Sequence, residues 1–191
     1  MPKNSKVTPR VRETISASQI ESGLKTILSF LYQKFGSDLE DVALVGIQTR
    51  GVTLAERLAR LIESQKNIKV PVGSLDITLY RDDFSTSGIQ TIVGETNLNF
   101  NLDDKKIVLI DDVLFTGRTI RAALDELMDF GRPKSIALVA LIDRGHRELP
   151  IQADCAPITL ETKRDESIHV HLQENDGKEE ILICEPLDGG A

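Results

Sequence analysis

Two adjacent carboxylates and a glycine-centred turn lie within one short stretch of the sequence. Asp111 and Asp112 directly follow the aliphatic run 107–110, and Gly117 comes a few residues later. Paired carboxylates suit hydroxyl groups or a divalent cation. A glycine lets the backbone approach a ligand closely, and the N–H groups at the start of a helix favour a phosphate. The stretch therefore predicts a site that holds a phosphate beside hydroxyl groups or a metal ion.

The residues around this stretch indicate the elements that position it. The uninterrupted aliphatic run 107–110 is typical of a parallel strand covered on both faces, and apolar residues at helical spacing follow from Ile120 to Met128. Further apolar runs at 41–47 and 135–142 predict neighbouring strands. We therefore predict an α/β fold with a central, mainly parallel sheet flanked by helices.

Polar loops follow each of these predicted strands. Residues 48–51 include Arg50, and residues 143–147 include further basic side chains. Ligands of open parallel sheets bind beyond the carboxyl ends of the strands. We therefore expect two basic loops and the acidic pair to meet at one edge, an arrangement that suits a polyphosphorylated sugar.

Two other interpretations of the acidic pair were weighed. It can be a solvated strand end, or the metal-binding half of a nucleoside triphosphatase. A triphosphatase also needs a phosphate loop with its lysine. The segment Gly46–Thr53 has the glycine spacing, but Val52 occupies the lysine position. The triphosphatase interpretation is therefore disfavoured.

Four blocks of the sequence together resemble a known family. They are Leu44–Gly51, Leu75–Asp82, Val108–Thr119 and Leu141–Pro150, in this order. The third is similar to the phosphoribosyl pyrophosphate (PRPP) signature of the type I phosphoribosyltransferases. The whole set resembles the bifunctional pyrimidine operon attenuator and uracil phosphoribosyltransferase family, over roughly residues 40–154.

The resemblance implies a type I phosphoribosyltransferase fold with a small hood over the base. It implies conversion of uracil and PRPP to UMP and pyrophosphate, with Mg²⁺ as cofactor. Asp111, Asp112 and Arg50 would serve catalysis, and the two carboxylates would hold the metal directly or through ribose hydroxyls and water. The segment that would bind PRPP and its 5′-phosphate comprises Asp111, Asp112, Val113, Leu114, Phe115, Thr116, Gly117, Arg118 and Thr119.

The resemblance also assigns the other loops. Pyrophosphate would contact Thr49, Arg50 and Gly51, in a loop that often holds a cis peptide bond, and Arg81 from a flap between strands. The base or nucleotide would contact Asp143 and Arg144, and the stretch Cys155–Leu160 would belong to the hood.

RNA binding is the second activity of the resembled family. There, His146 and Arg147 are associated with RNA contact, which implies a UMP-responsive attenuator that binds pyrimidine-operon mRNA. The first helix departs from the family pattern, since Ile27, Phe30 and Phe35 replace residues that are usually basic. Arg144, Arg147, Lys163 and Arg164 are the cations that would restore a basic face. A transferase for another base, such as orotate or a purine, is the remaining alternative, because the hood diverges most.

The composition is that of a globular protein. The 191 residues are 40% hydrophobic and 28% charged, and the formal net charge of −7 disfavours a broad surface that coats nucleic acid. We expect a single domain over residues 1–191, with a flexible arm at 1–15 and a tail at 186–191. No apolar run is long enough to span a membrane, so we expect a cytoplasmic protein without a membrane partner.

Local signals place the remaining elements. Ser18–Glu21 has the form of a capping box and predicts a helix over 18–35, whose apolar stripe would pack in the core or between the subunits of a dimer or tetramer. Residues 70–80 predict a strand. Residues 168–172 predict another, which a hairpin turn at 175–177 joins to 181–184.

Overall fold

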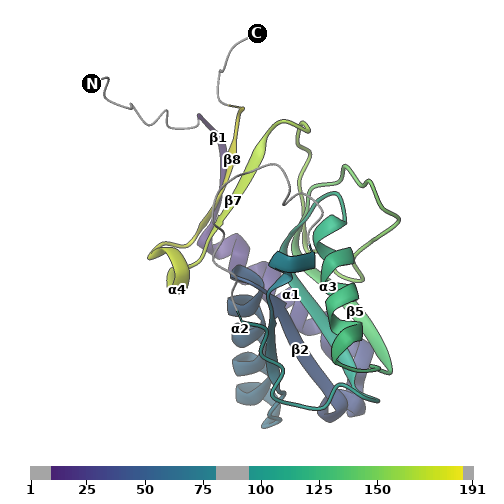
Figure 1. Cartoon of the computed structure of the whole chain (residues 1–191). Helices are drawn as coiled ribbons and strands as arrows, with labels where there is room; N and C mark the ends of the chain where they lie inside the picture. The colour runs from purple at the N-terminus through teal and green to yellow at the C-terminus, as the bar shows by residue number, and fades with distance from the viewer. Residues whose placement is uncertain (1–9, 81–94, 187–191) are drawn as a thin grey trace, which may run out of the picture.

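A parallel sheet forms the centre of the protein (Figure 1). The computed structural model describes residues 10–80 and 95–186, so the predicted flap and Arg81 lie outside the described residues. The sheet has five strands in the order β3-β2-β4-β5-β6. Their bounds are β2 (Val42–Ile47), β3 (Val72–Leu75), β4 (Lys106–Leu114), β5 (Ser135–Asp143) and β6 (Ile158–Thr159).

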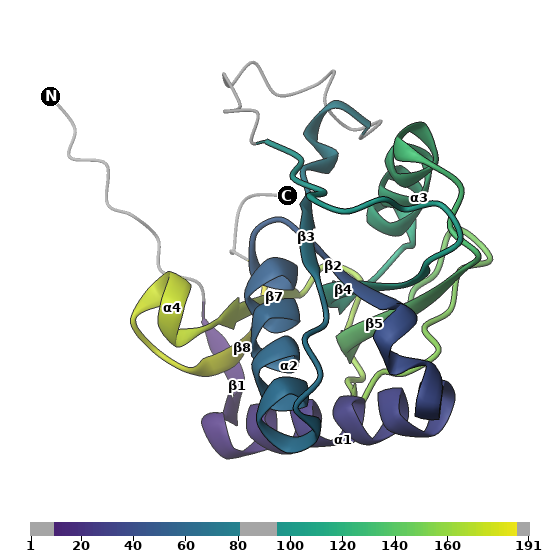
Figure 2. The same cartoon turned by 90° about the horizontal axis from the view of Figure 1, so that it is seen from below.

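Helices cover both faces of this sheet (Figure 2). Helices α1 (Ala17–Phe35) and α2 (Arg50–Lys66) pack on one face, and α3 (Arg118–Phe130) packs on the other. Alternate strand residues enter the two cores: Val108 and Ile110 face α1 and α2, whereas Ile107 and Leu109 face α3. The expected α/β architecture is confirmed, since strands covered on both faces read as continuous apolar runs.

A second, antiparallel sheet joins the two ends of the described chain. Its order is β1-β8-β7, with β1 (Val11–Ser16), β7 (Ser167–His171) and β8 (Glu180–Cys184). The short helix α4 (Gln173–Asp176) connects β7 to β8, so the hairpin is confirmed, but its connection begins before the turn expected at 175–177. The prediction of a flexible arm over residues 1–15 is wrong from Val11 onward, because β1 pairs with β8.

Three sequence predictions fail in detail. The strand expected over 70–80 ends at Leu75, and the 3₁₀ turn η2 (Ile77–Tyr80) follows; another, η1 (Gly36–Asp41), follows α1. The strand that precedes the carboxylates includes them, because β4 continues to Leu114 beside β5. The stretch Cys155–Leu160 lies along the edge of the central sheet, where β6 pairs with β5, and does not form a separate hood.

Helix α1 is packed within its own chain. It begins one residue earlier than expected, and the capping pair is Ser16 with Gln19, whose side chain accepts the Ser16 N–H at 3.0 Å. Ile27 and Phe35 are buried, and Phe30 packs against the same core. The expected core packing is confirmed, and the alternative of an apolar surface between subunits is wrong for this stripe. Within residues 10–80 and 95–186, no helix combines the length and apolarity that crossing a membrane requires.

Candidate active site

The start of α2, which follows β2, touches β4 through its backbone. Gly51, the second residue of α2, lies so close to β4 that an added Cβ would be 2.4 Å from the Ile110 carbonyl oxygen and 3.4 Å from the Asp111 Cα. Gly46 of β2 is equally close to the same helix start, with the Gly51 carbonyl oxygen 2.4 Å from its Cβ position. Only glycine permits this approach, which brings the start of α2 beside the acidic pair.

The acidic pair lies at the carboxyl edge of the sheet. Asp111 is only 6% exposed, and its Oδ1 accepts the backbone N–H of Asp112 at 2.9 Å. Asp112 is half-buried. The alternation of β4 side chains between the two cores changes at these residues, since Val113 packs with the α1 and α2 core whereas Leu114 packs with the α3 core.

The predicted phosphate turn leads directly into α3. Gly117 is the N-cap residue with φ of +93°, a left-handed conformation that favours glycine. A Cβ atom added to Gly117 would lie 3.3 Å from the Cβ of Leu149 and 3.4 Å from the Cβ of Ile151. The Thr116 carbonyl accepts N–H groups from Glu148 and Leu149. The turn after β4 is therefore held by the loop after β5, and the start of α3 points its N–H groups towards the acidic edge.

The side chains of the β5 loop mostly hold the loop itself. Asp143 accepts the Gly145 N–H at 2.8 Å and Arg147 Nη2 at 2.5 Å. Burial alone would raise the pKa of Asp143, but Arg147 and the Gly145 N–H outweigh it and keep the pKa below its ordinary value. Arg147 also donates to the carbonyls of Phe115 and Ile151, at 2.7 and 2.9 Å. A cavity of about 480 Å³ lies beside this loop, lined by Asp143, Gly145, Arg147, Leu149, Pro150, Ile151 and Gln152.

Arg144 is buried and joins three segments. It is 7% exposed, its guanidinium lies 4.0 Å from the centre of the Phe115 ring, and it donates to the Lys163 and Glu166 carbonyls at 2.9 and 3.0 Å. His146 packs its edge on the same ring and bonds the Thr162 carbonyl at 2.6 Å. The side chains of Arg144, His146 and Arg147 therefore bond to groups within the chain. From the sequence, Arg144 was expected to contact the base, and the other two were expected to contact RNA.

The loop after β2 carries the expected cis peptide bond, between Gln48 and Thr49. Arg50 follows, and its Nη2 lies 2.8 Å from Asp176 Oδ1 in α4. A cavity of about 220 Å³ adjoins this loop, with Thr49, Thr53 and Asn175 in its lining. The structure therefore joins the expected pyrophosphate loop to the β7–β8 hairpin.

Sequence reasoning missed two acidic residues at this site. Glu148 bridges the start of α3 to the 160–166 loop, since it pairs with Arg118 at 2.7 Å and with Arg164. Asp176 holds Arg50 from far along the chain. No motif in the sequence identifies either residue as part of the site, because the arginines that they pair with come from distant segments.

The acidic pair has the chemistry of a magnesium site that a substrate completes. Within the described parts of the chain, no group of three or more His, Cys, Asp or Glu side chains could hold a metal alone. Mg²⁺ commonly binds one or two carboxylates together with substrate phosphates. Asp111 and Asp112 supply that number of carboxylates, and the starts of α2 and α3 suit the phosphates.

Comparisons with known proteins agree with this geometry. The model of the phosphoribosyl transferase domain matches residues 15–175. Bifunctional protein PyrR from Caldicellulosiruptor bescii is 48% identical over 179 residues, 94% of this chain and 97% of the relative. The PyrR of Syntrophobacter fumaroxidans is 49% identical over 172 residues, 90% of this chain and 92% of the relative.

Solved structures support the fold. A hypoxanthine-guanine phosphoribosyltransferase from Bacillus anthracis has a TM-score of 0.68 at 17% identity, covering 92% of this chain and 98% of that one. A mutant Trypanosoma cruzi hypoxanthine phosphoribosyltransferase in a ternary substrates complex has a TM-score of 0.71 at 15% identity, covering 92% and 96%. With the family model and the PyrR relatives spanning most of its length, the chain belongs to the phosphoribosyl transferase family and, within it, to the PyrR proteins.

Proposed function

We propose that this protein transfers the phosphoribosyl group of PRPP to uracil, giving UMP and pyrophosphate. The observation that carries the proposal is the carboxylate pair at the end of β4, flanked by the starts of α2 and α3. This arrangement suits a sugar with a phosphate at each end. The choice of uracil rests on the similarity to PyrR proteins.

The proposed roles follow from the charge that develops during transfer. Departure of pyrophosphate leaves an oxocarbenium-like ribose, so negative groups favour the sugar and positive groups favour the leaving group. Asp111 and Asp112 hold ribose hydroxyls and lie near the developing cation. The N–H groups of residues 115–119 bind the 5′-phosphate, and those of residues 49–51 bind pyrophosphate. The reaction requires no nucleophilic side chain.

Magnesium belongs to this proposal. Asp111 and Asp112 would hold Mg²⁺ directly or through ribose hydroxyls and water. When bound, the ion neutralises negative charge on the leaving pyrophosphate. The loop at 143–147 would place the base through its backbone, because the Asp143 and Arg144 side chains bond within the chain. Contact of Arg81 with pyrophosphate stays a prediction.

Pyrophosphate release from PRPP, with Mg²⁺ and uracil, tests the transfer. We expect Asp111→Asn, which keeps the shape of the side chain, to lower kcat/KM by at least about 100-fold. The control is Asp125→Asn, which changes an exposed carboxylate on α3 and should leave turnover unchanged. Omitting the base should abolish release. Orotate or hypoxanthine supporting faster turnover than uracil would overturn the assignment of the base.

A second activity is proposed from the relatives, whose name describes them as bifunctional. We propose UMP-responsive binding of pyrimidine-operon mRNA. On α1, Lys25 and Lys34 pair with Glu21 and Asp154, so that helix offers little unpaired basic charge for this role. Lys163, which is exposed in the 160–166 loop, is the better candidate. Arg164 beside it is also exposed, although it pairs with Glu148.

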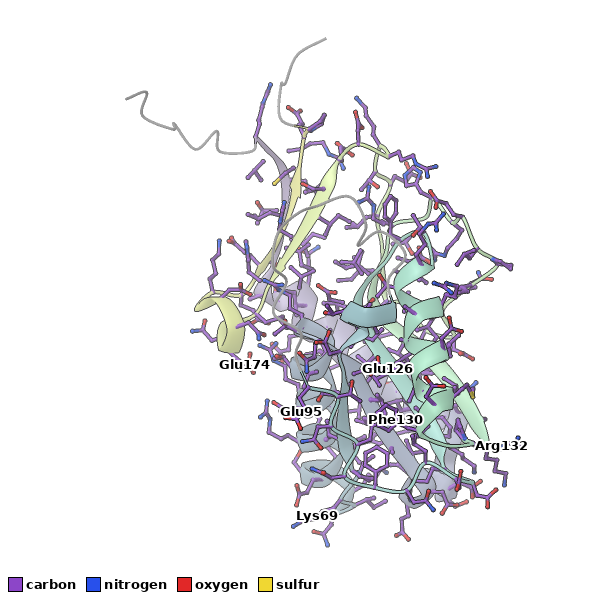
Figure 3. The ribbon with its side chains drawn as sticks, in the orientation of Figure 1. Lys69, Glu95, Glu126, Phe130, Arg132 and Glu174 are labelled. Carbon is purple, nitrogen blue, oxygen red and sulfur yellow. The ribbon has the colours of Figure 1, made fainter. Side chains whose placement is uncertain are left out.

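Binding of a pyrimidine-operon leader RNA, with and without UMP, tests the second activity. We expect affinity to fall steeply with salt, and the Lys163→Gln, Arg164→Gln double variant to reduce the slope of log affinity against log salt by about 1 to 2. A Lys69→Gln variant, in the segment that follows α2, is the control (Figure 3). RNA binding that does not respond to UMP would contradict the proposal.

The proposal also includes a cytoplasmic homo-oligomer, a dimer or a tetramer. Met128 and Phe130 near the end of α3 are large apolar side chains that a subunit contact would cover, since about half of each is exposed. Phe130 is labelled in Figure 3.

A further inference from the structure

The β7–β8 hairpin bonds to the first half of α2 at successive turns. Asp176 pairs with Arg50, and Asn175 Oδ1 accepts the Thr53 hydroxyl at 2.8 Å. Arg57, one turn further, donates to Glu174 at 3.0 Å and to Glu179 at 2.6 Å. Figure 3 shows Glu174 on α4 beside this helix. The hairpin therefore acts on the helix whose first residues form the proposed pyrophosphate loop.

The Asp176 carboxylate is fixed through both oxygens. Oδ1 pairs with Arg50 Nη2 at 2.8 Å, and Oδ2 accepts the Leu172 N–H at 3.0 Å. Burial would raise the pKa of Asp176, but the Leu172 N–H and Arg50 prevail and hold the pKa below its ordinary value. Asp176 is thus a preformed anion aimed at Arg50.

Arg50 directly precedes Gly51, whose backbone lies against β4. Its Nε is buried and has no hydrogen-bond partner among the described residues. An ion pair with partly exposed partners adds little to stability, so orientation is the larger consequence of this contact.

We infer that Asp176 is a positioning residue for phosphoribosyl transfer. By holding the Arg50 side chain on the hairpin side, it fixes the peptide units of residues 49–51 so that their N–H groups face the pyrophosphate. The inference rests on the proposed function of this loop. It changes the expected role of Arg50, whose guanidinium becomes the anchor of the loop while its backbone makes the contact.

A competing possibility predicts the opposite effect of Asp176 on PRPP binding. If the Arg50 guanidinium itself bound pyrophosphate, Asp176 would compete with the substrate for it. Removing the Asp176 charge would then strengthen PRPP binding, whereas the positioning role requires that it weaken binding. The two possibilities therefore separate in one measurement.

Steady-state pyrophosphate release by the full chain, with Mg²⁺ and uracil, provides the test. We expect Asp176→Asn to raise the KM for PRPP about five- to tenfold, within the range for one ordinary hydrogen bond, with the KM for uracil unchanged. Asp176→Glu should restore part of the loss. The matched control is Glu174→Gln in the same short helix, which bonds Arg57 and should leave both KM values unchanged.

A double-variant cycle tests whether Asp176 acts through Arg50. We expect Arg50→Gln and Arg50→Gln with Asp176→Asn to have the same KM for PRPP, because the second change removes nothing further. Additive effects, a lowered KM in Asp176→Asn, or an equal change in Glu174→Gln would each overturn the inference.

The same assay separates this inference from the proposed function. Absence of uracil-dependent turnover in the unaltered protein would reject the function. Normal turnover with an unaffected Asp176→Asn variant would reject only the positioning role. Calorimetric titration with PRPP and Mg²⁺ gives the comparison without turnover, and equal affinity in both proteins would again reject positioning.

Discussion

Glu126 is a carboxylic acid on the inner side of α3 (Figure 3). It is 4% exposed; Thr96 donates its hydroxyl to Oε1, and Oε2 is buried without a hydrogen-bond partner among the described residues. Burial raises the pKa of Glu126, and the nearby Asp76 and Asp129 add to this, against the lowering effect of Thr96. Burial therefore makes the ionised form of Glu126 less favourable than it is in water.

This raised pKa predicts the sign of a pH effect on stability. Between the ordinary pKa of a glutamate and the raised value, the folded state binds more protons than the unfolded state, so the free energy of unfolding falls as pH rises. We expect Glu126→Gln to remove this fall, so that its stability relative to the unaltered protein improves from acid to neutral pH. Urea unfolding of both proteins at several pH values measures this difference in stability.

Thr96→Val is the companion variant for this test. It removes the hydrogen bond that lowers the pKa of Glu126, so the pKa should rise further and the loss of stability should extend to higher pH. A pH dependence that is identical in all three proteins would show that Glu126 does not cause it.

The residues with the clearest local signals could be predicted from the sequence. Asp111 and Asp112 near the end of β4, and Gly117 at the start of α3, lie where the aliphatic run and the helical spacing predicted them, whereas their roles stay predictions. The partners of Arg50 and Arg144 could not be predicted, because Asp176 and Glu166 come from segments that only the folded chain brings near.

At the scale of elements, the β5 loop and the 160–166 loop are joined by one arginine. We expect Arg144→Met to lower the free energy of unfolding by about 2 to 3 kcal/mol, since it leaves buried carbonyls without their charged donor. Arg144→Lys should recover little, because an ammonium cannot reproduce the planar group that stacks on Phe115. Urea unfolding measures both.

Arg164→Met serves as the control for this loop. Its side chain is 64% exposed, so the change should stay within about 0.5 kcal/mol. An equal loss of unfolding free energy in Arg144→Met and Arg164→Met would show that the buried, stacked position of Arg144 does not stabilise the protein.

The long helices and strands could be predicted because their apolar pattern continues over many residues. The short strands depend on pairing with a neighbouring strand, which the sequence does not show. The strand expected over 70–80 stops where its neighbour stops, since Ile47 of β2 pairs with Leu75 and nothing in the ladder lies beyond. The two-residue strand β6 has no period to detect; it exists because the edge of β5 is available.

At the scale of the whole molecule, one core spans both sheets. Ile15 of β1 and Ile181 of β8 belong to the same buried cluster as Leu44 and Leu54. The single domain expected from chain length stays a prediction, and this shared core supports it. We expect one cooperative unfolding transition, with coincident far-ultraviolet dichroism and near-ultraviolet absorbance curves.

Ile15→Ala tests whether the small sheet contributes to that common transition. Ile15 is 3% exposed, so we expect a loss of about 2 to 4 kcal/mol while the two curves still coincide. Val11→Ala, at a side chain that is 45% exposed in the same strand, should change stability by less than about 0.5 kcal/mol. Two separate transitions in Ile15→Ala would show that the sheets fold independently.

The pairing of β1 with β8 also bears on how the protein is made. β1 leaves the ribosome long before its partner β8 is translated. The short helix that bears Asp176 also lies in this later part of the chain. A nascent chain that has not yet reached Asp176 therefore lacks both the neighbour of β1 and the anion that pairs with Arg50.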